Sequence, residues 1–128
     1  MTIPDYQTLM LPILSFSKDR KEHSLKEADD VLARDFQLTE SDRNKKQPSG
    51  RVTIFRNRIS WAKMYMEKAG LLESTRRGCF RITRRGLREL EKSLPFINVR
   101  YLKRFPEFLK FKKINPPKNS YSRGNKKP

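Results

Sequence analysis

The stretches TIFRNRISWAKMYMEKAG (53–70) and LLESTRRGCFRIT (71–83) decide the fold of this chain. Apolar residues recur at helical spacing in the first stretch, and Gly70 follows them as a stop signal. This apolar stripe consists of Phe55, Ile59, Ala62, Met66 and Ala69. The second stretch holds two short strand-like runs, 71–74 and 79–83, on either side of a polar turn. Together they predict a helix over 53–69 followed directly by a β-hairpin.

Three further helices are predicted around this unit. The first covers about 5–16, with Asp5 as its cap and a kink at Pro12. The second begins at the capping box of Ser24 and Glu27 and runs to about residue 38, and Thr39 then starts a short helical turn. The last follows the hairpin and is capped by Thr83. Three helices followed by a hairpin are the winged-helix arrangement, so the fold class is mainly α with a small β-hairpin.

The chain of 128 residues has room for one domain, which we place at 1–110. An aromatic segment follows Pro95 and extends over 96–111. From Lys112 onward the sequence is rich in Lys, Asn, Ser and Pro and holds no acidic residue. Residues 111–128 are therefore predicted to form a basic, disordered tail.

Positive charge is concentrated in the second half of the chain. Residues 1–50 hold 8 Lys and Arg against 9 Asp and Glu, whereas residues 51–128 hold 22 against 5. The two parts carry −1 and +17, which add up to the formal net charge of +16. Such a balance favours a polyanionic partner such as DNA, RNA or an anionic membrane surface. Because the predicted helix 53–69 and the hairpin lie in the basic half, we expect that partner to be double-stranded DNA.

Two elements are the candidates for contact with DNA. Helix 53–69 would enter the major groove, where Arg suits guanine and Asn suits adenine. The turn at 75–79 would be the wing, which brings two arginines to phosphates or a narrow minor groove. The predicted DNA-binding residues are Arg51, Thr53, Arg56, Asn57, Ser60, Lys63, Arg76, Arg77 and Arg81.

Other reactive or aromatic side chains have simpler interpretations. We expect Trp61 and Tyr65 to pack against the first or last helix, and His23 to be solvated in a charged loop. A single Cys, Cys79, and a single His cannot form a structural zinc site. Carboxylates cluster at 19–42 in the pattern of a solvated helix face, and no phosphate-binding Gly-rich loop is present. We therefore predict no catalytic residue, no metal and no cofactor.

Several short stretches are shared with a known family. The most specific series is Ser49-Gly-Arg51, Asn57-Arg58 and Trp61-Ala62. Weaker similarities are Ile3-Pro-Asp-Tyr6, Leu11-Pro-Ile-Leu14, Lys68-Ala-Gly-Leu-Leu-Glu73, Arg76-Arg-Gly78, Ile82-Thr83 with Gly86, and Arg104-Phe-Pro-Glu-Phe108. Over about residues 3–109 the chain resembles the N-terminal domain of Mrr-type restriction endonucleases, the modification-dependent (type IV) systems of prokaryotes.

The resemblance implies a winged helix that binds or senses target DNA for an attached nuclease. That nuclease is normally a separate C-terminal domain with a carboxylate-and-lysine active site, so the resemblance transfers no catalytic residue to this chain. The single cysteine fits a reducing cytoplasm, and the longest apolar run, Leu9 to Leu14, is far shorter than the about 20 residues of a membrane span. We therefore expect a location in the prokaryotic cytoplasm, at the nucleoid, and no membrane partner.

Two other functions remain open at this stage. One is a module that pairs with itself or with a separate nuclease subunit, using Phe96, Tyr101, Phe105 and Phe108 as an interface. The other is a transcriptional regulator. A divergent nuclease would need a carboxylate cluster that the sequence does not show.

Overall fold

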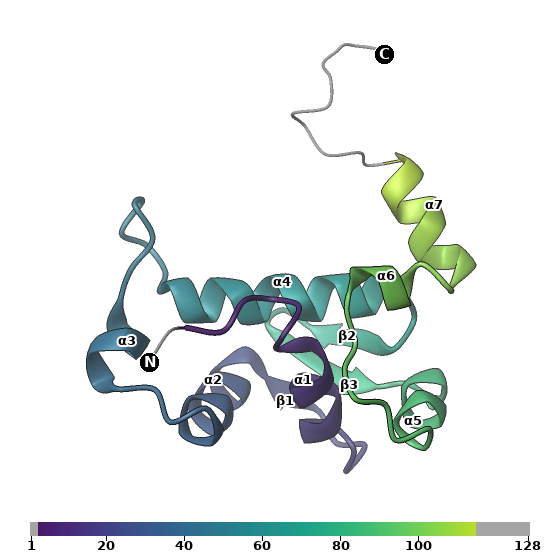
Figure 1. Ribbon diagram of the computed structural model, residues 1–128, viewed down its shortest axis with the longest axis horizontal. Helices are drawn as coiled ribbons and strands as arrows, with labels where there is room; N and C mark the ends of the chain where they lie inside the picture. Colours follow the sequence, from purple (N-terminus) through teal and green to yellow (C-terminus); the bar gives the residue numbers. More distant parts are fainter. Residues whose placement is uncertain (1–2, 115–128) are drawn as a thin grey trace.

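The computed structural model describes residues 3–114, which are mainly helical with one three-stranded antiparallel sheet (Figure 1). This architecture confirms the predicted winged-helix class. The first four helices are α1 (Met10–Phe16), α2 (Leu25–Asp35), α3 (Glu40–Asn44) and α4 (Ile54–Lys68). The strands are β1 (His23–Ser24), β2 (Leu72–Arg76) and β3 (Cys79–Ile82). The last helices are α5 (Arg84–Leu90), α6 (Val99–Leu102) and α7 (Pro106–Ile114).

Helix starts follow the capping residues that the sequence shows. Ser24 and Glu27 form the predicted capping box at the start of α2, with hydrogen bonds of 3.0 and 2.8 Å. Thr39, Thr53 and Thr83 each accept a backbone N–H at 3.0 Å at the starts of α3, α4 and α5. These caps confirm the predicted starts of all four helices.

The first helix begins later than predicted. In place of a helix from residue 5, Asp5 Oδ1 accepts the backbone N–H of Thr8 at 2.7 Å, and α1 starts only at Met10. Pro12 thus falls in the first turn, where backbone N–H groups have no partner within the helix. The proline sets the start of the helix and does not kink its middle.

α4 is the central element of the core. It contributes the predicted stripe of Phe55, Ile59, Ala62 and Met66, all completely buried. α1 and α2 pack on it from one side, and β2 follows it across Gly70, whose φ of 80° suits a glycine. In Figure 1 it lies across the molecule, with α1 and α2 below it and α6 and α7 at its C-terminal end.

The sheet has the order β1-β3-β2. Its hairpin turn is only Arg77 and Gly78, since β2 continues to Arg76, two residues beyond the predicted end. The sequence did not predict β1, which pairs His23 with Phe80. The side chain of His23 is 11% exposed, and its ring lies 4.4 Å from that of Phe16. The expectation that His23 is solvated was therefore wrong.

The aromatic segment after Pro95 forms part of the core. Phe108 is completely buried, and Tyr101 and Phe105 are half-buried. Only Phe96, 60% exposed, keeps the character expected of an interface residue. The expectation of an exposed interface was therefore wrong for Tyr101, Phe105 and Phe108, because α6 and α7 fold back onto the end of α4. α7 extends to Ile114, past the boundary expected at 110, and the rest of the expected tail lies outside the described residues.

Gly86 is the point where α5 approaches the hairpin most closely. A Cβ atom there would overlap the carbonyl oxygen of Leu71 and lie 2.7 Å from Cγ1 of Ile82. We predict that Gly86→Ala lowers the free energy of unfolding by about 1–3 kcal/mol, as overpacking does. Urea unfolding measures this. Arg88→Ala, exposed on the same helix, is the control and should change stability by at most about 0.5 kcal/mol; equal losses would contradict the steric argument.

Candidate nucleic-acid interface

The loop between α3 and α4 forms a basic arm. Backbone hydrogen bonds from Ile54 N to the Lys45 carbonyl (2.8 Å) and from Gln47 N to the Val52 carbonyl (3.0 Å) close it into a narrow hairpin. It extends beyond the N-terminal end of α4 (Figure 1). Lys45, Lys46 and Arg51 are exposed, and residues 45–53 hold no acidic side chain. This segment, 45–53, is called the basic arm below.

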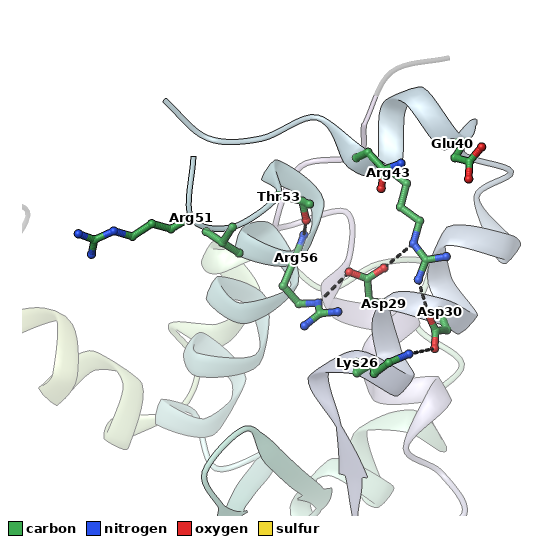
Figure 2. Close-up of a pocket in the computed structure, with 10 residues that line it drawn as sticks. Lys26, Asp29, Asp30, Glu40, Arg43, Arg51, Thr53 and Arg56 are labelled. Atoms are coloured by element: carbon green, nitrogen blue, oxygen red, sulfur yellow. Dashed lines mark hydrogen bonds and ion pairs between the residues drawn. The ribbon is translucent and has the colours of Figure 1, made fainter. Parts of the chain in front are cut away.

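A buried carboxylate joins α2, α3 and α4 beside this arm (Figure 2). Asp29 of α2 has a side chain only 5% exposed. Its Oδ1 accepts the Nε–H of Arg43 and its Oδ2 accepts the Nε–H of Arg56, both at 2.8 Å. Arg43 also donates to Asp30, which in turn pairs with Lys26 at 3.1 Å. The pKa of Asp30 is lowered, chiefly by the hydrogen bond from Arg43.

This network changes the interpretation of Arg56. Its Nε is committed to Asp29, and its side chain is 34% exposed. No hydrogen bond from its two terminal nitrogens is found within residues 3–114. They border an open hollow of about 440 Å³ that is lined by Lys26, Asp29, Asp30, Glu40, Arg43, Asn44, Arg51, Val52, Thr53 and Arg56. Arg56 therefore holds α4 against α2 through its Nε, and its terminal nitrogens remain available as donors toward the hollow.

The face of α4 that points away from the core is largely polar. Asn57 and Ser60 lie on it, half-buried, as the helical spacing predicted. Trp61 is 47% exposed there and meets the ring of Tyr65 edge-on, with ring centroids 6.1 Å apart. Tyr65 packs between the N-terminal segment and α7, as expected, whereas Trp61 is more exposed than a packing residue. Lys63 is only 12% exposed and pairs with Glu67 at 2.8 Å.

The β2–β3 hairpin carries three arginines in different states, two in the wing and one in β3. Arg76 pairs with Glu22 at 2.6 Å, which lowers the pKa of Glu22 and raises that of Arg76 through their hydrogen bond. Arg81 pairs with Glu73 across the strands at 2.9 Å. Arg77, in the turn, is exposed and makes no ion pair with any residue that the structure describes.

The predicted site residues therefore fall into three groups. Arg56, Lys63, Arg76 and Arg81 are ion-paired within the chain. Thr53 uses its hydroxyl to cap α4. Arg51, Asn57, Ser60 and Arg77 keep their polar side chains available, with Arg51 pointing away from the Asp29 network in Figure 2. The structure brings Arg51, Thr53 and Arg56 together around one hollow.

Arg43, Lys45 and Lys46 belong to this surface but were not predicted. The run Arg43-Asn-Lys-Lys46 is a visible basic signal. The polar residues around it are also typical of an ordinary loop before the main helix, so the sequence alone does not single this run out. The residues around Asp29 in the sequence do not indicate its role, because its partners Arg43 and Arg56 lie 14 and 27 residues further along the chain.

Neither a metal site nor a membrane-spanning helix is found in the described part of the chain. No group of three or more His, Cys, Asp or Glu side chains in residues 3–114 is placed to hold a metal ion. No helix in the same range has the length and apolar character needed to cross a membrane.

The chain matches the model of a known protein family. The model of the Mrr N-terminal domain family matches residues 6–92, which include α1 to α5 and the whole sheet. No curated protein and no solved structure matches the chain.

Asp29 should contribute strongly to stability, because it satisfies two guanidinium groups from a buried position. We predict that Asp29→Ala lowers the free energy of unfolding by about 2 kcal/mol, less than for a fully buried pair because both arginines are partly exposed. Thermal or urea unfolding measures it. Asp35→Ala, an exposed carboxylate on the same helix, is the matched control, and an equally small effect of both variants would rule out this role.

Proposed function

The chain belongs to the Mrr N-terminal domain family, and from that premise we propose that it is a restriction-system module that binds duplex DNA. In this proposal α4 enters the major groove and the wing, 75–79, contacts the phosphate backbone. In this proposal the module serves a nuclease and does not itself cut DNA. It acts where the chromosome lies, in the cytoplasm.

One observation supports this proposal above the others. The outward face of α4 carries the polar Asn57 and Ser60 and is bordered at its N-terminal end by the basic arm, which has no acidic residue. A helix N-terminus with exposed cations beside it attracts phosphate. The excess of +17 in residues 51–128 gives the long-range attraction that a polyanion requires.

The structure allows a division of roles among the predicted residues. Asn57 and Ser60 are the candidates for base edges, since they lie in the N-terminal half of α4 on its outward face and their side chains form no hydrogen bond within residues 3–114. Arg51 and Arg77 are the candidates for phosphates, as exposed cations that form no ion pair within the described chain. Arg56, held through Nε by Asp29, has its terminal nitrogens left to donate to one further phosphate.

An interaction module remains the second candidate on one observation. Phe96 is exposed beside a shallow apolar hollow that it shares with Leu11, Pro12, Phe36 and Ile97. Tyr101, Phe105 and Phe108, which the sequence suggests for the same interface, are half-buried or buried. Duplex binding is therefore the better-supported function.

Loss of the two unpaired arginines should weaken duplex binding in a salt-dependent way. We predict that the double variant Arg51→Ala/Arg77→Ala makes the negative slope of log K against log[salt] shallower by about 2, since each lost phosphate contact removes about 0.9 from its magnitude. Fluorescence anisotropy over a salt series measures it. Arg34→Ala/Arg88→Ala removes two exposed arginines from α2 and α5 as the control. Equal slopes for both double variants would overturn the assignment of Arg51 and Arg77.

Removal of Glu22 should strengthen binding. Glu22 neutralises Arg76 at 2.6 Å, so Glu22→Gln releases a cation at the wing and removes an anion from it. We expect the duplex dissociation constant to fall several-fold at low salt and the salt slope to rise by about 1. Glu91→Gln, an exposed carboxylate without an ion pair in the described chain, controls for the change in net charge. A gain of the same size in both variants would show that the wing is not in contact with DNA.

A further inference from the structure

The helices α6 and α7 form a second basic surface that the predicted site does not include. Over residues 99–113 they carry six cations and one acidic residue, Glu107. The six are Arg100, Lys103, Arg104, Lys110, Lys112 and Lys113. Both carboxylate oxygens of Glu107 bind Arg85 of α5, at 2.9 and 3.2 Å. Within residues 3–114 none of the six cations forms an ion pair, so their charge has no local counterion.

This surface is fixed to the C-terminal end of α4. The ring of Tyr65 contacts those of Phe108 and Phe111, with centroids 5.7 and 5.9 Å apart. Lys68 lies over Phe111 at 5.4 Å, and Lys112 lies over Tyr65 at 5.5 Å. Aromatic packing therefore holds the cations of α7 in place beside the helix that the proposed function puts in the groove.

The basic arm and α7 lie at opposite ends of α4 and extend on the same side of it (Figure 1). α4 has 15 residues and is therefore about 22 Å long. The major groove is about 12 Å wide. A helix of this length that crosses the groove has both ends beyond its edges, where the two phosphate backbones lie.

The two ends of α4 differ electrostatically. Its N-terminus attracts phosphate through the helix dipole, but its C-terminus carries partial negative charge and repels it. A backbone at the C-terminal end therefore needs cations from another element, and α6 and α7 supply them. We propose that α6 and α7 are a second phosphate-binding surface, which holds one DNA strand while the basic arm holds the other.

The inference rests on the proposed function and adds a specific expectation to it. Contacts with phosphates carry no base information, so α7 should raise the affinity for every duplex alike and set the crossing direction of α4. The contribution should be lost steeply with salt.

The test is a charge-removal variant of exposed lysines, Lys103→Gln/Lys110→Gln/Lys113→Gln, in the full chain. Anisotropy with two duplexes of unrelated sequence should show a salt slope lower by about 2–3 and a loss of about tenfold or more in affinity at physiological salt, equal for both duplexes. Circular dichroism and thermal unfolding check that the variant folds, which is expected because all three side chains are exposed.

The matched control is Lys18→Gln/Lys21→Gln/Arg34→Gln, which removes the same charge from exposed positions. These positions lie on α2 and the loop after α1, below α4 in Figure 1 and away from α7. A change in slope equal to that of the control overturns the inference, while the Arg51/Arg77 double variant still reports on the proposed function. If the unaltered chain shows no salt-dependent duplex binding, the proposed function and this inference both fail. Loss of affinity for only one of the two duplexes would also overturn a role in phosphate binding.

Discussion

The carboxylate of Asp29 is the interaction on which the rest of this surface depends. It lies buried between the guanidinium groups of Arg43 and Arg56, at 2.8 Å from each Nε. One acidic side chain of α2 therefore fixes both the start of α4 and the end of α3, from which the basic arm extends. A buried charge is costly to leave unpaired, so the arginines and the aspartate hold one another in a defined geometry. The base of the arm is thus held in two ways: Asp29 binds Arg43 and Arg56 on either side of it, and the Ile54 N–H at the start of α4 donates to the Lys45 carbonyl.

Local signals explain why much of the fold could be predicted. Each of the caps at Ser24, Thr39, Thr53 and Thr83 acts within three residues of itself, and the stripe of α4 repeats over a long helix. The features that were missed depend on distant partners. β1 has two residues and exists only because β3 lies beside it, and α6 has four residues that pattern alone cannot distinguish from a loop. The aromatics of 96–111 were expected on the surface because their contacts with α4 are not visible in sequence.

The same distinction applies to the candidate site. Sequence composition shows that the excess of cations lies in residues 51–128, and helical spacing placed Asn57 and Ser60 on the outward face of α4. It could not separate cations that are neutralised within the fold from those that remain available. Arg76 and Arg77 are neighbours in sequence, yet Glu22, 54 residues before Arg76, pairs with one and not the other. Ion pairing is a tertiary property, so a count of arginines overestimates the charge that a surface offers to DNA.

The charged residues of this surface fall into two sets with opposite effects, unpaired cations and arginines that are neutralised by carboxylates. Under the proposed function the cations at both ends of α4 favour any duplex, because attraction to phosphate does not depend on sequence. The carboxylates of Glu22, Asp29 and Glu73 neutralise Arg76, Arg56 and Arg81 within the fold. Under the proposed function these ion pairs lower the non-specific attraction to phosphate, since an unpaired arginine would bind phosphate in any register. Affinity would then come mainly from the unpaired cations at the two ends of α4, and specificity from Asn57 and Ser60, whose hydrogen bonds depend on the base that they meet.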